Sequence, residues 1–429
     1  MSGGTPTGLT EALAQLRDGR TDAHAYLDTC YDRIDAREPQ LGAWQSLRPR
    51  DACHRWLDDN ADGLAGTPLR GLPVAIKDII DTADMPTTMG SALHADRQPA
   101  DDAACVAALR SAGALILGKT VTTEFAYFSP GKTANPRDLR CTPGGSSSGS
   151  AAAVADGMVP VALGSQTAAS VIRPAAYCGT MGYVATRGLM SLRGVQPLAQ
   201  SHDSLGIMGR SFADIRLIAE LLAGPLPTPS SPLQGLHILR VPGAAMGDVS
   251  PEMEAAIDKL AAELREAGAT VTDLADDGRI ARLVALHGAV MAFEAARNMA
   301  AEGARSDAVS PQFAELLETG RGIALADHAA AQSEIRQLGQ WLEAARAGSA
   351  AILAPAAPGS APEGHAATGA PHMSRAWQAL GLPVVTWPAD ADAQGRPLGA
   401  QLIGHRWRDA ELLELGRKTA LLTPSPTLR

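Results

Sequence analysis

Two serine-containing segments and one lysine have the residue types and spacing for nucleophilic chemistry. Residues 144–150 form a Gly/Ser-rich run, and residues 164–174 hold Ser170 in a stretch of small side chains. Lys77 ends a short apolar run upstream of both. A serine hydroxyl needs a base at neutral pH, and a lysine can supply it when burial disfavours the ammonium. The three parts together predict a hydrolase with a serine nucleophile and a neutral lysine base.

Each serine segment has a simpler interpretation when taken alone. The run 144–150 is compatible with a flexible linker, although strand and helix signals follow it closely. It is not a phosphate loop, because no Gly-Lys-Ser/Thr follows the glycines. Ser170 lacks the Gly-x-Ser-x-Gly elbow of α/β-hydrolases. The tight turn before it, Thr167, Ala168 and Ala169, can instead present backbone N–H groups to one point, as an oxyanion hole requires.

Other residues compete for the roles of base and nucleophile. The simpler interpretation of Lys77 is a solvent-exposed side chain at the end of a strand. Lys119, in Leu-Gly-Lys-Thr, is a rival candidate for the base, and the same simpler interpretation applies to it. The adjacent His202 and Asp203 are the nearest histidine–aspartate pair to consider for a catalytic role. The simpler interpretation is that both are ordinary loop residues. Cys178 lies close to Ser170 but suits a small core residue better than a nucleophile. These alternatives stay open at the level of single residues.

The elements around these residues follow a rhythm of helix, glycine and strand. The apolar run 72–76 predicts a strand, and a helix capped by Asp101 and Asp102 is expected to end at Gly113, before a buried strand over 114–117. A short helix over 150–155 and a strand over 159–163 come next. This rhythm favours a largely parallel sheet covered by helices.

The remaining segments surround that central part. Helical spacing over 9–35 predicts one or two helices that end before Pro39. Residues 251–268 and 269–274 predict an amphipathic helix and a strand, and residues 283–347 are helical, Ala-rich and charged. Strands over 383–387 and 400–403 precede a final helix capped by Asp409. The segment 283–347 is therefore interpreted as a cap that shapes a substrate pocket.

Bulk properties narrow the class of protein. With 429 residues the chain exceeds the size at which one core usually stops growing, so two domains or one large α/β unit are expected. A net charge of −9 without charged blocks argues against a nucleic-acid surface. The sequence shows neither a signal peptide nor an apolar run long enough to span a membrane. Five widely spaced cysteines without a CxxC pattern are typical of reduced thiols, so a cytoplasmic location is expected.

The order of several short motifs resembles the amidase signature family, over residues 70–222 and again over 380–415. The motifs are an apolar run ending in Lys77-Asp78, Leu-Gly-Lys-Thr followed by Glu124-Phe125, Asn135-Pro136, Gly-Gly-Ser-Ser at 144–147, Ser-x-x-Arg-Pro-Ala at 170–175 and Gly-Ala-Gln-Leu-Ile-Gly at 399–404. Residues 166–179, Gln-Thr-x-x-Ser-Val-Ile-Arg-Pro-Ala-Ala-Tyr-Cys-Gly, are similar to the malonamidase branch.

The resemblance implies a fold, a domain layout and a set of roles. The fold is a single large α/β/α domain over 1–429, in which helices cover a twisted mixed sheet, with a signature core at 70–222 and a helical cap at 283–347. Ser170 is implied to be the nucleophile, Ser146 a bridging serine on a cis peptide bond and Lys77 the base, without a metal or a cofactor. Backbone N–H groups of Thr167, Ala168, Ala169 and Ser170 are implied to bind the oxyanion.

The sequence also departs from the family pattern. Ala168 and Ala169 stand where glycines are usual, and so does Ser148. Gln166, where many relatives carry Asp, is expected to hydrogen-bond inside the turn. The arginine that matches Arg173 is associated in the malonamidase branch with a substrate carboxylate, and a structural ion pair is the alternative for this residue.

The predicted function is hydrolysis of the C–N bond of a small amide through an acyl-enzyme. Hydrolysis of a carbamate (urethane) or an ester uses the same chemistry and is an alternative. An amidotransferase A-type subunit, which acts within a complex, and an inactive relative that only binds are the rivals from other classes. The expected partner is a small amide or carbamate, not a nucleic acid or a membrane, and the substrate's identity and a homodimer are left open.

Overall fold

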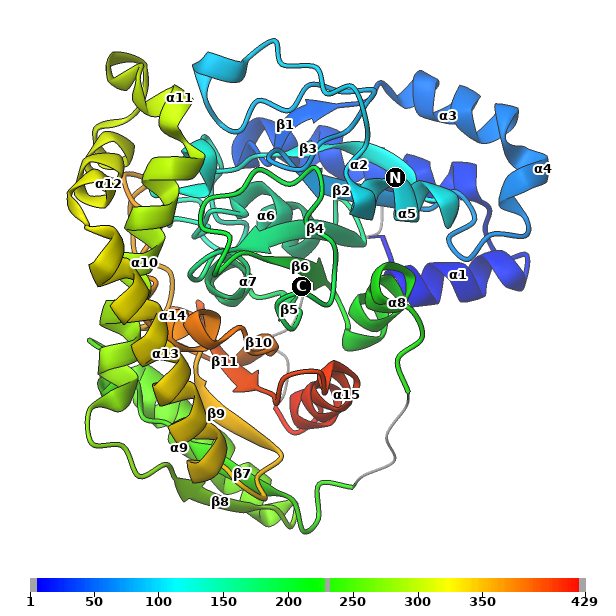
Figure 1. The fold of residues 1–429 in the computed structure, drawn as a ribbon. Helices are drawn as coiled ribbons and strands as arrows, with labels where there is room; N and C mark the ends of the chain where they lie inside the picture. The colour runs from blue at the N-terminus through cyan, green and yellow to red at the C-terminus, as the bar shows by residue number, and fades with distance from the viewer. Residues whose placement is uncertain (1–5, 228–231, 424–429) are drawn as a thin grey trace.

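One 11-stranded mixed sheet is the centre of the computed structural model, which describes residues 6–227 and 232–423 (Figure 1). The strand order is β1-β3-β2-β4-β6-β5-β10-β11-β9-β7-β8. The strands are β1 (Trp44–Leu47), β2 (Pro73–Lys77), β3 (Leu115–Thr120), β4 (Val161–Gln166), β5 (Met181–Val184), β6 (Ser204–Gly209), β7 (His237–Arg240), β8 (Thr270–Asp273), β9 (Ala351–Pro355), β10 (Val384–Ala391) and β11 (Pro397–Ile403). The α/β class with a mixed sheet, expected from the sequence, is confirmed.

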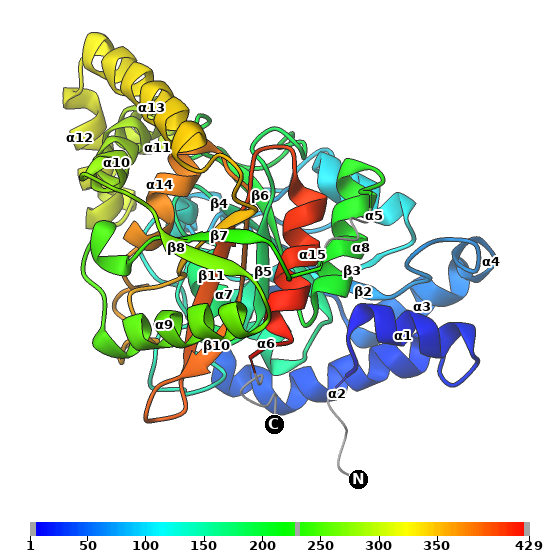
Figure 2. The ribbon, with the colours of Figure 1, turned by 90° about the horizontal axis from the view of Figure 1, so that it is seen from below.

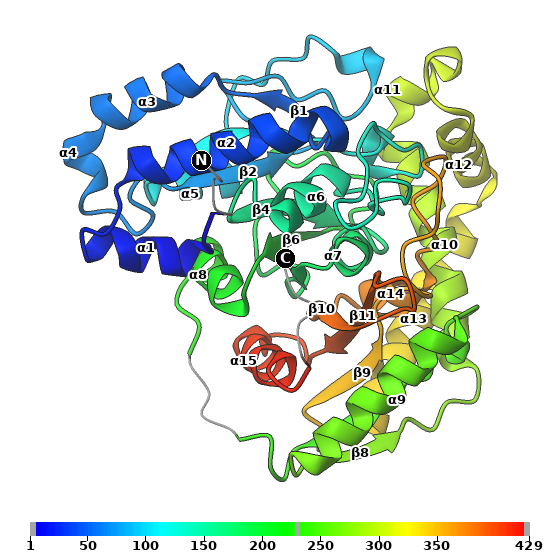
Figure 3. The same cartoon turned by 180° about the vertical axis from the view of Figure 1, so that it is seen from behind.

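Helices cover both faces of this sheet. They are α1 (Leu9–Arg17), α2 (Ala23–Leu41), α3 (Arg50–Asp59), α4 (Ala61–Leu64), α5 (Ala104–Ser111), α6 (Ser148–Asp156), α7 (Ile172–Cys178), α8 (Phe212–Ala223), α9 (Pro251–Glu266), α10 (Arg279–Asn298), α11 (Ala300–Gly303), α12 (Pro311–Gly322), α13 (Leu325–Ala345), α14 (His372–Leu380) and α15 (Asp409–Ala420). Helices α5, α8 and α15 lie on one face (Figure 1), and α2, α6 and α7 lie on the other (Figure 3). Helices α10–α13 flank one side of the sheet (Figure 2).

The alternation of side chains along each strand supplies both hydrophobic cores. In β2, Val74 and Ile76 belong to the cluster with α5, α8, α9 and α15, whereas Ala75 belongs to the cluster with α2, α6, α7 and α14. Successive residues of a strand point to opposite faces, so a strand buried on both faces is apolar throughout. This arrangement explains why the sequence shows continuous apolar runs here.

The sheet is less parallel than the helix–strand rhythm predicts. Strands pair in parallel only at β2–β3, β2–β4, β7–β8 and β7–β9 within the described residues, and the remaining pairs are antiparallel. Strands β10 and β11 form a hairpin around residues 392–396, where Gly395 has a positive φ of 78°. A connection this short joins antiparallel neighbours only, so local turn chemistry prevails over the expected crossover.

The first long helix continues past the proline expected to end it. Helix α2 includes Pro39 and ends at Leu41, and Gly42 follows in the left-handed conformation with φ 58°. Proline removes one hydrogen bond and crowds the preceding turn. Because Pro39 stands in the last turn, that effect is confined to the helix end, and Gly42 provides the stop.

Two predicted caps make tertiary contacts instead. Helix α5 follows Ala103, and the Asp102 carboxylate accepts from the Ala83 N–H at 2.8 Å. Asp409 is the first residue of α15, after the cap position at Arg408, and its carboxylate accepts from the Tyr183 hydroxyl at 2.7 Å and from the Thr186 N–H at 2.8 Å. Each carboxylate therefore joins segments that are distant in sequence. Within the described ranges, no helix combines the length and apolar character needed to cross a bilayer.

Candidate active site

Lys77 occupies the carboxyl end of β2, between β3 and β4. Strands β2 and β4 are parallel neighbours, so their carboxyl ends meet at one edge and Lys77 reaches Ser165 of β4. The lysine is 0% exposed, and its Nζ lies 2.6 Å from Ser146 Oγ and 3.0 Å from Ser165 Oγ. Burial lowers the pKa of Lys77 to about 7, against the opposing effect of the Asp203 carboxylate. The amine is thus neutral in a large fraction of molecules near pH 7.

Ser146 lies in the loop that leads into α6, where backbone contacts fix its place. The Gly145–Ser146 peptide bond is cis, and Gly144 has a φ of 79°. A Cβ on Gly144 would approach Pro174 Cα to 2.9 Å, so glycine is required both for conformation and for space. The Thr123 N–H donates to the Ser146 carbonyl at 3.2 Å, and the Ser147 N–H donates to the Ser170 carbonyl at 3.1 Å. The second bond holds the two serine segments together.

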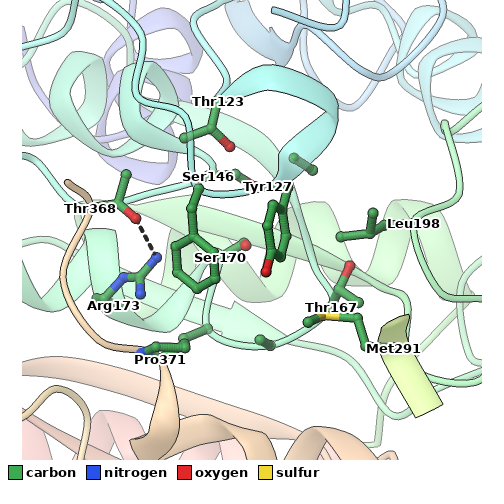
Figure 4. A pocket seen from close by; sticks show the side chains of 14 residues that line it. Thr123, Tyr127, Ser146, Thr167, Ser170, Arg173, Leu198, Met291, Thr368 and Pro371 are labelled. Carbon is green, nitrogen blue, oxygen red and sulfur yellow. Dashed lines mark hydrogen bonds between the residues drawn. The ribbon is translucent and has the colours of Figure 1, made fainter. Parts of the chain in front are cut away.

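Ser170 ends the turn that follows β4, with 7% of its surface exposed. Its hydroxyl forms no hydrogen bond with Ser146 or another described residue, whereas both side chains face one pocket (Figure 4). Hydrogen bonds between catalytic groups are often long without substrate and tighten only in the reacting complex. Lys77 and Ser146 are therefore in contact in this structure, whereas the hydrogen bond between the Ser146 and Ser170 hydroxyls is expected to form only in the reacting complex.

The turn before Ser170 leaves donors available. The N–H groups of Ala168, Ala169 and Ser170 have no acceptor in the described part of the chain. Neither alanine is among the non-glycine residues with positive φ, so an L side chain fits both positions without left-handed strain. The replacement of the usual glycines is thus compatible with an open turn.

The side chain of Gln166 stabilises this turn through hydrogen bonds. Its Oε1 accepts from the N–H groups of Val171 and Ile172 at 2.9 and 3.0 Å, and its Nε2 donates to Gln378 Oε1 at 3.1 Å. The side chain is fully buried and is not part of the pocket lining. Gln166 therefore satisfies the first backbone donors of α7, in agreement with the expected hydrogen bonds inside the turn.

Arg173 lies on the pocket wall without a carboxylate partner among the described residues. Its guanidinium donates to the carbonyls of Gly369 at 2.5 Å and Gly145 at 2.6 Å, and to Thr368 Oγ1 at 3.1 Å. The side chain is 3% exposed, its Nε has no hydrogen-bond partner, and burial lowers the pKa of Arg173 to about 10. The ion pair considered for it is not found there, and a buried positive charge faces the pocket uncompensated.

The pocket is small and mostly apolar, with a cavity volume of about 20 Å³. Arg173 and Thr368 lie toward one end of it, and Leu198 and Met291 toward the other (Figure 4). The lining residues are Thr123, Ala126, Tyr127, Phe128, Ser146, Thr167, Ala168, Ala169, Ser170, Arg173, Leu198, Met291, Thr368 and Pro371. This volume is well below that of typical small-molecule sites, so the pocket suits a compact ligand.

The rival candidates for the base and the nucleophile are not among the residues that line this pocket. Lys119 Nζ donates to Thr87 Oγ1 at 2.6 Å and pairs with Asp78 at 3.5 Å. His202 is fully buried, and burial lowers its pKa to about 3. Cys178 is a buried core residue. None of the three lines the pocket, whereas Ser146 and Ser170 do.

Several contributors to the site have no sequence signal that identifies them. Ser165, which contacts Lys77, lies within the segment 164–174 but resembles any small strand residue. Met291 of α10, Thr368 and Pro371 reach the pocket from distant parts of the chain. Asp203 accepts from Thr167 Oγ1 at 2.5 Å, so it supports the turn rather than pairing with a catalytic histidine.

Solved structures share this architecture. A crystal structure of an amidase superposes with a TM-score of 0.88 and 27% identity, over 97% of this chain and all of that chain. The native peptide amidase from Stenotrophomonas maltophilia superposes with a TM-score of 0.81 and 28% identity, over 98% of each chain. Both likenesses extend over nearly the whole molecule.

Sequence comparison assigns the family. The Amidase family profile matches residues 25–413, and this chain belongs to the amidase signature family of amidases and related hydrolases. It is also similar to the A-type subunit of the glutamyl-tRNA(Gln) amidotransferase of Chloroflexus aggregans, with 37% identity over 290 residues. That alignment spans 62% of this chain and 59% of the relative, so less than two thirds of the relative's length is covered.

Proposed function

We propose that this protein is a serine hydrolase that cleaves the C–N bond of a small linear amide, with Lys77, Ser146 and Ser170 as its catalytic residues. The observation that carries the proposal is the buried contact of 2.6 Å between Lys77 Nζ and Ser146 Oγ, beside a pocket onto which Ser170 opens. A buried amine with a pKa of about 7 is poised to exchange a proton at neutral pH.

In the proposed mechanism, the Ser146 hydroxyl relays protons between Lys77 and Ser170. A neutral amine has a lone pair that accepts the Ser146 proton, while its N–H groups donate to Ser165. A hydroxyl both donates and accepts, so Ser146 in turn takes the proton of Ser170 as Ser170 attacks the carbonyl carbon. The same relay, reversed, protonates the leaving amine, and water then cleaves the acyl-enzyme.

The turn at 167–170 is proposed to stabilise the oxyanion. The N–H groups of Ala168, Ala169 and Ser170 have no acceptor among the residues that the structure describes, and these residues line the pocket. Donors of this kind, fixed before the reaction, stabilise negative charge that develops on the carbonyl oxygen. The proposed first test is steady-state hydrolysis of a panel of small amides by the purified full-length chain, and absence of turnover on every amide, carbamate and ester would contradict the proposal.

The proposed base gives a definite pH dependence. Only neutral Lys77 accepts a proton, and its neutral fraction rises with pH through about 7. We expect kcat/KM for an uncharged amide to increase about tenfold per pH unit below that value and to level off above it. Measurement from about pH 5.5 to about pH 9.5 checks this, and a flat or falling profile would exclude Lys77 as the base.

Arg173 is proposed to bind an anionic group on the acyl side of the substrate, because its buried charge has no carboxylate partner in the described structure. We expect Arg173→Gln to raise KM about tenfold or more for an amide whose acyl group carries a carboxylate, and to change KM little for an uncharged analogue of the same size. Arg137→Gln is the matched control, since Arg137 donates to the carbonyls of Cys178 and Gly179, outside the pocket. An equal loss for both substrates would assign Arg173 a structural role.

An amidotransferase component is the second candidate, since the amidotransferase relative is named for that activity. Such a protein would depend on a complex and would release ammonia from glutamine. Hydrolysis of other small amides by the isolated chain, at rates that glutamine does not match, would exclude it. Carbamates and esters belong in the same substrate panel, because an acyl-enzyme mechanism also cleaves them.

The proposed layout gives each region a role. The core 70–222 supplies the catalytic residues, and the cap 283–347 supplies Met291 to the pocket. A cytoplasmic location is part of the proposal, because five buried free cysteines suit a reducing compartment.

A further inference from the structure

We propose that His287, on α10, is a positioning residue that aims the Thr167–Ala168 peptide group at the reacting carbonyl oxygen. The inference rests on the proposed function and adds to it a residue outside the motifs of the core. His287 lies 120 residues from Thr167 in sequence, on a helix of the proposed cap. It contacts none of the reacting atoms, so its effect passes through the peptide group that it holds.

A single buried hydrogen bond makes the connection. His287 Nε2 lies 2.7 Å from the Thr167 carbonyl oxygen, and the side chain is 0% exposed. A carbonyl oxygen only accepts, so Nε2 carries the proton and donates. Burial holds the pKa of His287 well below its usual value, so the ring is neutral at physiological pH. A neutral ring has one N–H, which leaves Nδ1 unprotonated, and that atom has no hydrogen-bond partner among the described residues.

The geometry of a peptide group turns this bond into a directional constraint. The Thr167–Ala168 bond is trans, so the carbonyl oxygen and the following N–H point to opposite sides of one plane. Fixing the Thr167 oxygen toward α10 therefore fixes the Ala168 N–H on the opposite side. That N–H has no acceptor in the structure as described, and Ala168 lines the pocket. A donor to the carbonyl also polarises the peptide and strengthens its N–H as a donor.

A second set of contacts holds the same residue from its side chain. Asp203 accepts from Thr167 Oγ1 at 2.5 Å and from the N–H groups of Leu198 and Ala199 at 3.0 and 3.1 Å. Glu294, also on α10, accepts from the Ser201 N–H at 2.8 Å in the same loop. Helix α10 thus fixes the Thr167 carbonyl directly and the Thr167 hydroxyl through the loop 198–203.

The ring of His202 lies stacked on the ring of His287. The rings of His202 and His287 lie 4.3 Å apart between centroids, with an interplanar angle of 11°. His202 Nδ1 approaches the Ser201 carbonyl at 3.0 Å, and the His202 side chain forms no hydrogen bond with Thr167 in the described structure. His202 is therefore a neighbour of the same shape and burial that lacks the bond to the turn, which makes it a matched control.

The test compares His287→Phe with His202→Phe in the full-length chain. Phenylalanine keeps a ring for the stack but cannot donate, so we expect His287→Phe to lower kcat about 10- to 100-fold, with KM for a small amide within about twofold. His287→Gln, which retains an N–H donor on a side chain of similar reach, is expected to recover part of kcat. His202→Phe is expected to retain kcat within about threefold.

The rate at which a fluorophosphonate labels Ser170 is the second measurement, because phosphonylation also places an oxygen against the turn. It is expected to fall in His287→Phe in parallel with kcat. A lower unfolding temperature with unchanged kcat and labelling rate would overturn the positioning role. Should His287→Phe not fold, His287→Asn replaces it, since its amide is too short to reach Thr167, and equal kcat for the Asn and Gln variants would overturn the inference.

The two proposals fail in distinguishable ways. If the wild-type protein hydrolyses no amide, carbamate or ester and is not labelled at Ser170, the proposed function is wrong and the positioning role with it. If the wild-type protein is active and labelled while His287→Phe retains both rates, only the positioning role is wrong.

Discussion

Replacing Ser170 with alanine is expected to lower kcat/KM for a small amide by at least about 10³-fold. The variant lacks the hydroxyl oxygen that would form the acyl-enzyme, but it keeps the pocket and the backbone N–H donors of the turn at 167–170. Residual turnover from the oxyanion donors and substrate binding alone is expected to be slow. Steady-state kinetics on the best amide of the panel measures the loss, and the thermal unfolding temperature is expected to stay close to that of the wild type.

The matched control for this variant is Ser147→Ala. Ser147 is as buried as its neighbours and donates to the Ser165 carbonyl at 3.4 Å, but it does not line the pocket. We expect Ser147→Ala to keep kcat/KM within about tenfold of the wild type. Near-normal activity of Ser170→Ala, or an equal loss in both variants, would remove Ser170 from the role of nucleophile.

Lys77→Met is expected to lower turnover by about 10³-fold or more, because it removes the proposed base and nearly preserves its volume. It is also expected to raise the unfolding temperature at about pH 7–8. The folded-state pKa of about 7 lies below the ordinary 10.5, so the unfolded chain binds the proton more readily between these values. Lys77 therefore destabilises the folded state in that window, and stability rises with pH through it. Kinetics and thermal unfolding of one sample measure both effects.

For Lys119→Met we expect the opposite combination of effects on stability and turnover. Lys119 is fully buried and pairs with Asp78 at 3.5 Å, outside the pocket. Removing it leaves a buried carboxylate without its ion-pair partner, which destabilises the fold by roughly 3–5 kcal/mol. We expect this variant to unfold at a lower temperature and to retain turnover per folded molecule. A large loss of turnover in Lys119→Met together with normal turnover in Lys77→Met would exchange the roles of the two lysines.

Much of the central fold could be predicted because its signals are local. The apolar runs before Lys77 and around Leu117 correspond to β2 and β3, and the helix and strand expected between Ser150 and Leu163 correspond to α6 and β4. A buried strand must be apolar on both faces, so its pattern is visible without knowledge of its neighbours. The order of motifs added the class of fold, which the structure confirms.

The errors arose where distant segments decide the outcome. Asp409 has the residue type of a helix cap, but Tyr183 and Thr186, more than 200 residues away, supply its partners. Antiparallel pairing of β6 with β4 depends on tertiary packing that no local pattern encodes. A local effect explains the other difference: the sequence predicts a helix end before Pro39, but α2 runs to Leu41, because a proline in the last turn costs a helix little.

In the candidate site, too, some residues are predictable from the sequence and others depend on the packing of distant segments. The order of motifs in the sequence predicts the roles of Lys77, Ser146 and Ser170, and the structure adds the contact between Lys77 Nζ and Ser146 Oγ. Met291 and His287 could not be found from sequence, because a methionine and a histidine on a helical face are ordinary core residues there. Only the packing of α10 against the turn at Thr167 gives them a place in the site.

The most direct test of the proposed catalytic residues is a crystal structure of the protein after reaction with a fluorophosphonate. The account predicts a phosphorus atom bonded to Ser170 Oγ, its oxygen within hydrogen-bond distance of the Ala168 or Ala169 N–H, and Ser146 Oγ between Ser170 and Lys77. A phosphonyl group on any other residue, or Lys77 turned away from Ser146 in the adduct, would contradict it.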